Sequence, residues 1–321
     1  MKKIYTVACM AISLLILLIS NSCNNPSDKT AVNDKAKDSI NVRISRGSYL
    51  VNTVCICMHC HADRDFTKFS GPIVPGTEGK GGEEINPGIY VRNITPYALG
   101  DWTDDEIYRV LTTGIRKNGD TLTMLMPYAA YVKMPKEEIY SIIAYLRTLK
   151  PIAYKVPERK IDGAVRQFWT DVYKKIYFKR AGEKMPLPSP GDKMAMGAYL
   201  VNAGNCNGCH TKFHRKIMDF DPDAYLAGGN LFNDSARNIK VTTANLTPDT
   251  ATGIGSWTEE MFLNKFKNYR DKSACNYSPG KYNTFMPWTV VANMKDDDIT
   301  AIYAYLRTIK PVKNQVNKWP Q

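Results

Sequence analysis

The feature that most constrains this chain is an internal duplication. The segment at 47–52 reads Gly-Ser-Tyr-Leu-Val-Asn and recurs at 197–202 as Gly-Ala-Tyr-Leu-Val-Asn. Asn-Ile-Thr-Pro at 93–96 recurs as Asn-Leu-Thr-Pro at 245–248, and residues 126–148 align with 286–308 without a gap. A fixed internal repeat means that one structural unit is built twice. We therefore expect two related domains.

The length agrees with that expectation, because 321 residues accommodate two domains of about 100–150 residues plus linkers. The copies span 43–151 and 192–311, with a connector at 152–191 and a tail at 312–321. With 44% hydrophobic and 23% charged residues, the chain is neither wholly disordered, nor collagen, nor a multi-span membrane protein. Lys and Arg exceed Asp and Glu by 12, but no nucleic-acid motif accompanies that excess, so no nucleic-acid partner is expected.

Each copy is predicted to be helical. Apolar residues recur at helical spacing from Ile139 to Leu149 and from Ile299 to Leu306, and Pro151 and Pro311 follow both segments. Thr103 with Glu106 forms a capping-box pattern, which predicts a helix beginning just after Trp102. No long alternating strand pattern is present, so the expected fold class is all-α.

The N-terminus has the features of an export signal. Lys2 and Lys3 precede an apolar run that ends at Ile19, and small residues follow before Cys23. This pattern predicts a signal peptide at 1–22, a lipidated Cys23 and a flexible tether at 23–42. Lipidation would anchor the chain on the periplasmic side of a bacterial membrane. The alternative is an uncleaved span, since about 17 apolar residues can just cross a bilayer.

The cysteine spacing indicates the cofactor. Cys57-Met-His-Cys60-His61 and Cys206-Asn-Gly-Cys209-His210 are both C-x-x-C-H, the pattern of covalent haem attachment. Two thiols at this spacing can add to the two vinyl groups of a haem, and the adjoining His can bind the iron. A disulfide or a zinc half-site is the alternative, but zinc would need further ligands and the chain has only four His. We therefore expect two c-type haems.

A sixth iron ligand is expected downstream of each motif. Met126 and Met286 are equivalent in the repeat and each precedes a proline, which favours an extended loop. The alternative is plain core packing, since Met often fills gaps. Met134 and Met294 also recur, but they lie just before the closing helices and are interpreted as packing residues.

These motifs together resemble a known family. The sequence is similar to dihaem proteins built of two class I cytochrome c domains, such as the cytochrome subunits of membrane-bound alcohol and gluconate dehydrogenases. The resemblance rests on both C-x-x-C-H motifs, both Asn-x-Thr-Pro segments, the Gly-Ile-Gly-Ser-Trp-Thr segment at 253–258, both Met-Pro pairs and both Ala-Tyr-Leu-Arg-Thr helices. It covers residues 43–312 and implies two tandem class I cytochrome c domains, each wrapped around a covalently bound haem.

The resemblance also implies contacts. Gly47 and Gly197, in the first helix of each copy, would cross the closing helix at Tyr145 and Tyr305. Pro72 would supply the carbonyl that accepts the ring proton of the iron-binding His, with Pro222 the candidate in the second copy. Further residues would contact the haem, through propionates or at its edge, unless they serve ordinary turns and caps: Asn93, Thr95, Trp102, Asn245, Thr247 and Trp257.

The remaining features are less specific. The connector has an amphipathic helical pattern from Ile161 to Tyr177 with basic residues on its other faces, which suits either a clamp between the domains or a docking surface. Cys55 and Cys275 have no equivalents in the repeat and are either free thiols or a disulfide.

A haem with both axial positions filled exchanges electrons rather than binding substrate. We therefore expect an electron-transfer protein rather than an enzyme, with no catalytic residues and with redox partners such as a dehydrogenase, an oxidase or a reductase. A dihaem peroxidase is the rival, and it needs one haem with an exchangeable ligand.

Overall fold

A computed structural model describes residues 26–123, 125–160, 162–164, 167–168, 170–171, 184–189, 191–214 and 219–320. The expected signal peptide, Cys23 and most of the amphipathic pattern at 161–177 lie outside these residues. The chain divides into two compact units, Met1–Val42 and Arg43–Gln321. Within the described ranges, none of the helices combines the length and the apolar character that crossing a bilayer requires.

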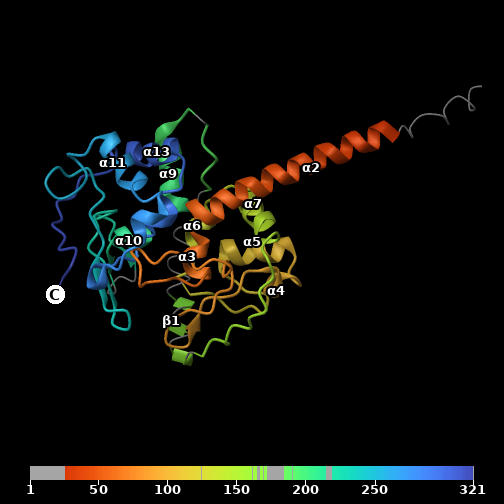
Figure 1. The fold of residues 1–321 in the computed structure, drawn as a ribbon, viewed down its shortest axis with the longest axis horizontal. Helices are drawn as coiled ribbons and strands as arrows, with labels where there is room; N and C mark the ends of the chain where they lie inside the picture. Colours follow the sequence, from red (N-terminus) through yellow and green to blue (C-terminus); the bar gives the residue numbers. More distant parts are fainter. Residues whose placement is uncertain are drawn as a thin grey trace, which may run out of the picture. The chain divides into compact units, whose positions relative to one another are not determined.

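The first repeat (43–151) contains mostly short helices joined by long loops (Figure 1). Helix α2 covers Pro26–Tyr49, so the stretch expected to be a flexible tether (23–42) is helical from Pro26 onward, and the last residues of the helix belong to this repeat. The elements that follow are the π-helix η1 (Leu50–Val54), α3 (Cys57–His61), β1 (Glu84–Asn86), β2 (Ile89–Tyr90), α4 (Pro96–Leu99), α5 (Asp104–Thr113), α6 (Tyr128–Tyr131) and α7 (Lys136–Leu146).

The second repeat (192–311) follows the same helical order. Its elements are α9 (Lys193–Ala203), α10 (Cys206–His210), β3 (Phe213–His214), β4 (Asp219–Phe220), β5 (Leu231–Asp234), β6 (Ile239–Thr242), α11 (Glu259–Lys267), the 3-10 helices η2 (Lys272–Cys275) and η3 (Gly280–Tyr282), α12 (Trp288–Val291) and α13 (Asp296–Leu306). Helices α3, α5, α6 and α7 thus have counterparts in α10, α11, α12 and α13.

The expected closing helices and the expected cap are confirmed. Helices α7 and α13 end at Leu146 and Leu306, one turn earlier than the prolines alone would require. Thr103 accepts a hydrogen bond from the backbone of Glu106, whose carboxylate accepts one from the Thr103 backbone, so α5 begins at Asp104 with a complete capping box.

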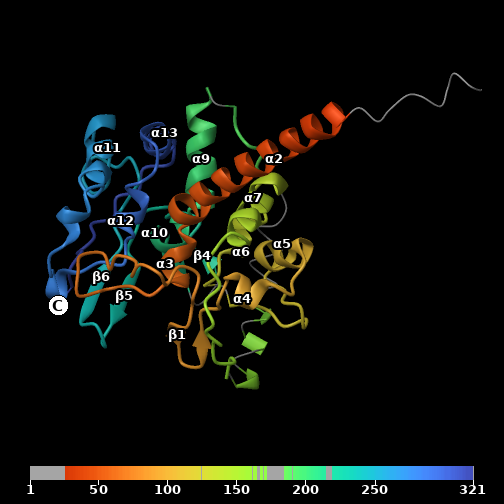
Figure 2. The ribbon, with the colours of Figure 1, turned by 45° about the vertical axis from the view of Figure 1, so that its right-hand side comes forward.

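The crossing of the first helix with the closing helix is also confirmed. A Cβ added at Gly47 would lie 1.8 Å from the carbonyl oxygen of Ser141 and 2.9 Å from the Cβ of Tyr145. One added at Gly197 would lie 2.0 Å from the carbonyl oxygen of Ala301 and 2.7 Å from the Cβ of Tyr305. Figure 2 shows α9 and α13 side by side. Glycine is required at both crossings because the backbones meet there.

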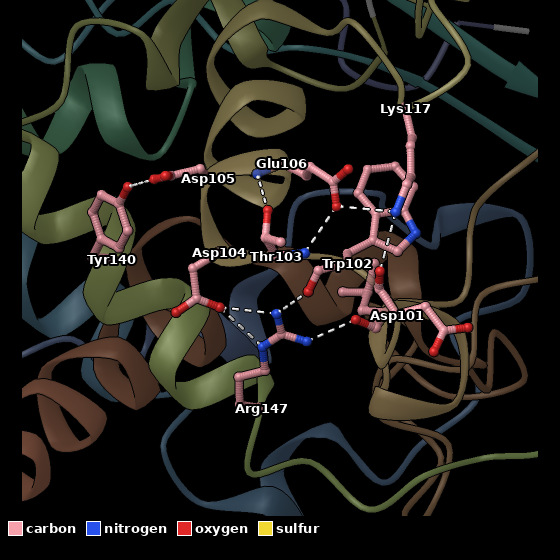
Figure 3. A network of polar contacts seen from close by, with 10 residues as sticks. Asp101, Trp102, Thr103, Asp104, Asp105, Glu106, Lys117, Tyr140 and Arg147 are labelled. Atoms are coloured by element: carbon pink, nitrogen blue, oxygen red, sulfur yellow. Dashed lines mark hydrogen bonds and ion pairs between the residues drawn. The ribbon is translucent and has the colours of Figure 1, made fainter.

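An arginine just after each closing helix binds the loop that leads into α5 or α11. Arg147 donates to the carbonyls of Leu99, at 2.7 Å, and Trp102, and it pairs with Asp104 at 2.9 Å (Figure 3). Arg307 donates to the carbonyl of Gly255 at 2.7 Å in the second repeat. The repeated Ala-Tyr-Leu-Arg-Thr sequence therefore ties the closing helix to the loop that carries each tryptophan.

The two repeats share one hydrophobic core, which contains residues from Leu50 to Leu306. A buried polar link joins them as well. Arg46 donates to both carboxylate oxygens of Glu138, and the buried hydroxyl of Tyr199 donates to the same carboxylate at 2.7 Å. The side chain of Glu138 is only 7% exposed. Removing one member would leave buried polar groups unpaired, which is costly.

The expectation of an all-α fold is incomplete. The described residues include three two-stranded antiparallel sheets, in which β1 pairs with β2, β3 with β4 and β5 with β6. Each strand is only two to four residues long. Strands this short do not produce the alternating pattern from which a strand is predicted.

Candidate haem-binding sites

Each C-x-x-C-H motif lies on its own short helix, and both helices begin in the same unusual way. The residue before the first cysteine, Ile56 or Asn205, has a left-handed backbone with φ of 48°. Asparagine tolerates this conformation, whereas a β-branched residue such as isoleucine is strained in it. The same turn in both repeats therefore reflects the geometry of the motif rather than a preference of either residue.

The histidine of each motif is oriented by a backbone carbonyl. Nδ1 of His61 lies 2.7 Å from the carbonyl oxygen of Arg92, and Nδ1 of His210 lies 2.8 Å from that of Ala244. Because a carbonyl oxygen only accepts, Nδ1 carries the proton and Nε2 keeps its lone pair. Burial also lowers the pKa of both rings, which favours the neutral form that binds a metal.

The expectation that Pro72 supplies this carbonyl is wrong. The Pro72 carbonyl instead accepts from the backbone N–H of Asp65 at 2.9 Å. The true acceptors occupy one repeat-equivalent position, directly before Asn-x-Thr-Pro. A backbone carbonyl has no residue signature, so only the shared position relative to that motif could have revealed it.

None of the described cysteines forms a disulfide, so Cys55 and Cys275 are not paired with one another. Burial raises the pKa of Cys57 and of Cys206 to about 12, so both are neutral at physiological pH. Burial and the nearby Cys60 raise the pKa of Cys209 to about 11.

The two motifs lie close to one another. The chain segments that lead into them are in contact, since a Cβ added at Gly204 would lie 3.2 Å from the carbonyl oxygen of Val54. Groups attached at the two motifs would therefore be neighbours.

Met126 and Met286 occupy equivalent loops just before α6 and α12. Each is partly buried against the core, and its carbonyl accepts from the backbone N–H two residues later, at 2.9 Å in the first loop and 2.8 Å in the second. Met134 and Met294 are 1% and 4% exposed and lie in the core, as expected of packing residues.

The four polar residues of the Asn-x-Thr-Pro segments form local turns and tie each segment to the residues that follow the closing helix. The Asn93 amide donates to the carbonyls of Ile152, at 2.9 Å, and Tyr154, at 3.1 Å. The Asn245 amide donates to the carbonyl of Val312 at 2.8 Å and to a threonine hydroxyl. These bonds use both hydrogens of each amide. The hydroxyls of Thr95 and Thr247 donate to the carboxamide oxygens of Asn93 and Asn245, both at 2.8 Å.

The two tryptophans differ in their surroundings. Trp102 lines a hollow of about 290 Å³ together with Arg116, Lys117 and Asn118. The ring of Trp257 instead packs edge-on against Phe262, with ring centroids 6.5 Å apart.

Comparison with known proteins agrees with this geometry. Residues 194–310 match the family model of cytochrome c. The cytochrome c subunit of alcohol dehydrogenase (quinone) from Gluconacetobacter polyoxogenes is 28% identical over 285 residues, which cover 86% of this chain and 58% of that protein. The chain resembles these class I cytochrome c subunits. The gluconate 2-dehydrogenase cytochrome c subunit of Pantoea cypripedii is 28% identical over 86% of this chain and 61% of its own length, and the fructose dehydrogenase cytochrome subunit of Gluconobacter japonicus 29% over 83% and 52%.

The chain therefore spans about three fifths of the length of the alcohol dehydrogenase relative. The family match supports a covalently bound haem with its iron. The donor set fits such a group, since it offers two neutral thiols and an imidazole nitrogen whose ring is fixed by a carbonyl. The relatives are cytochrome subunits of dehydrogenases, which supports electron transfer rather than substrate catalysis.

Proposed function

We propose that this protein is an exported dihaem c-type cytochrome that passes electrons between a dehydrogenase or quinol-oxidising complex and a terminal acceptor. The observation that carries the proposal is the same histidine–carbonyl bond in both repeats, at 2.7 Å and 2.8 Å. Metal-binding histidines usually donate their second ring nitrogen in this way. Two such sites support two tandem cytochrome c domains, at 43–151 and 192–311.

Each repeat would use its residues in the same roles. Cys57 and Cys60, and likewise Cys206 and Cys209, would form the thioether bonds. His61 and His210 would bind iron through Nε2, and Met126 and Met286 would each supply a sulfur ligand. A haem so held supplies an iron that cycles between two oxidation states.

The chain's own contribution is to fix these ligands and to keep the two sites close. The protonated Nδ1 of each histidine prevents the ring from turning, and the Met-Pro loops occupy equivalent places in the two repeats. If His and Met both bound the iron of each haem, no position would be left for a substrate. The close approach of Gly204 to the carbonyl oxygen of Val54, just before the two motifs, supports electron passage between the sites within one chain.

A dehydrogenase is proposed as the electron donor because the relatives are cytochrome subunits of an alcohol dehydrogenase (quinone), a gluconate 2-dehydrogenase and a fructose dehydrogenase. We place the protein on the periplasmic side of a bacterial membrane, anchored through a lipid on Cys23. Metabolic labelling with a clickable fatty acid tests the anchor: the wild-type chain should be labelled and the Cys23→Ser variant should not. A single N-terminal span would leave both unlabelled.

The function is tested by the optical spectrum of the dithionite-reduced holoprotein before and after carbon monoxide. Two closed haems should give no change, together with a haem content of two per chain. A shift at one haem would show an exchangeable ligand and would favour a dihaem peroxidase, which turnover of hydrogen peroxide would then establish.

A further inference from the structure

A loop of the first repeat is built into the Met-Pro loop of the second. Residues 66–70 follow the first haem motif, and they contact residues 277–288, which include Met286. Phe69 donates its backbone N–H to the carbonyl of Tyr277 at 3.0 Å, and its ring stacks on that of Tyr277 with centroids 5.4 Å apart. Phe66 packs against Phe285, immediately before Met286, with centroids 5.5 Å apart.

Ser70 makes the most direct contact. Its hydroxyl donates to the carbonyl of Met286 at 2.7 Å and accepts from the backbone N–H of Trp288 at 3.1 Å. Its own N–H donates to the side chain of Asn283 at 2.8 Å. Ser70 is fully buried, so water cannot replace these bonds.

Asn283 completes the link. It is 1% exposed, and its amide donates to the carbonyls of Phe66, at 2.9 Å, and Lys68, at 3.0 Å. Its oxygen accepts from Ser70 and from the backbone N–H of Thr284. Every polar atom of this side chain is thus used to hold the two loops together.

The backbone of Ser70 is strained, with φ of 62°. A non-glycine residue persists in this region only where its surroundings over-determine it. Arg64 supplies part of that constraint, because it donates to the carbonyls of Ser70 and, at 2.6 Å, Gly71. The strained turn aims the Ser70 hydroxyl at the Met286 loop.

The second repeat contacts the Met126 loop of the first repeat in a different way. The Asn202 amide of the second repeat donates to the carbonyl of Ala130 at 3.0 Å, four residues after Met126. The backbone N–H of Met126 itself donates within its own repeat, to the carbonyl of Thr123 at 3.2 Å.

We propose that Ser70 is a positioning residue for the loop that carries Met286, so that the first repeat holds in place the sixth-ligand loop of the second haem. This rests on the proposed function, which assigns Met286 as that ligand. Loss of the hydroxyl removes a buried hydrogen bond to the Met286 carbonyl. The bond between this methionine and the iron then competes less well with an added ligand.

The test is an imidazole titration of the oxidised holoprotein, in a Met126→His background that leaves one methionine-ligated haem. Ser70→Gly is the informative variant, because glycine adopts a φ of 62° without strain while the hydroxyl is lost. Loss of one buried hydrogen bond should raise the imidazole affinity by about two- to tenfold. The long-wavelength absorption band of the methionine–iron bond should weaken in parallel, and Ser70→Ala should act in the same direction.

Ser141→Ala is the matched control, since this serine is also buried but donates only to Glu137 within its own helix. If Ser70→Gly binds imidazole no more tightly than Ser141→Ala and keeps the methionine–iron band, the inference about Ser70 is overturned. The proposed function would then still stand. Absence of that band in the Met126→His parent would show that Met286 is no ligand, which overturns the proposed ligand set and this inference together.

Discussion

Replacing Gly197 with alanine should loosen the helix crossing that supports the second haem motif. The added Cβ would lie 2.0 Å from the carbonyl oxygen of Ala301, whereas ordinary contacts begin at 3.4 Å. The helices would have to move apart by most of that difference, because a backbone carbonyl cannot turn aside as a flexible side chain can. Overpacking of this kind costs about 3 kcal/mol at the upper end of the usual range.

Helix propensity opposes this cost, because alanine is favoured over glycine inside a helix by about 1 kcal/mol. The net loss in the free energy of unfolding is therefore about 2 kcal/mol. For a folded unit of this size such a loss lowers Tm by roughly 4–8 °C. The same reasoning applies to Gly47, whose added Cβ would lie 1.8 Å from the carbonyl oxygen of Ser141.

The assay is thermal unfolding of the holoprotein followed by far-ultraviolet circular dichroism. Gly191→Ala is the matched control, since a Cβ there meets nothing within 4 Å, and its Tm should stay the same or rise slightly. If Gly197→Ala unfolds within about 1 °C of Gly191→Ala, the crossing tolerates a methyl group and the close-approach argument is refuted.

Three further outcomes are expected. Glu138→Gln should lower Tm by roughly 4–8 °C by breaking the buried link between the repeats, whereas the exposed Glu137→Gln should change it by less than about 2 °C; equal effects would show that the buried link adds nothing. A hydrogen bond from an arginine side chain lowers the pKa of Asp296. In denaturant titrations, the difference in unfolding free energy between wild type and Asp296→Asn should therefore be largest near neutral pH and should shrink as pH falls below 3.8. A difference that stays constant with pH would contradict this. In potentiometric titrations, Met126→His and Met286→His should each lower the potential of a different haem, because nitrogen in place of sulfur favours the oxidised iron; a shift of both haems in one variant would argue against the ligand assignment.

Local sequence signals predicted the elements that depend on local physics. The spacing of Ile139, Ile142 and Ile143 predicted the closing helix α7. Thr103 with Glu106 predicted the residue at which α5 begins. In these cases the residues that carry the signal also make the contact. Helix periodicity and capping need only a few neighbouring side chains.

The features that escaped prediction depend on backbone atoms brought together by the fold. The carbonyls of Arg92 and Ala244 orient the histidines, although these two residues share no side-chain chemistry. Strands of two to four residues are likewise too short to show a period. The family resemblance implied Pro72, but its carbonyl instead accepts a local hydrogen bond from the backbone N–H of Asp65.

The duplication explains why some features are found by comparing the two copies and others are not. Positions that repeat, such as Gly47 with Gly197, serve the scaffold that both copies need, so comparing the copies reveals them. Contacts between the copies escape that comparison, even where they use repeated positions such as Tyr199 and Asn202. Ser70 bonds to the Met286 loop, and the reverse contact runs through Asn202 to a different part of the loop after Met126. The partners differ even where the residue repeats. Asn52 donates to the hydroxyl of Tyr145 in its own copy at 2.8 Å, whereas Asn202 donates to the carbonyl of Ala130 in the other copy at 3.0 Å, and only the folded chain shows this difference.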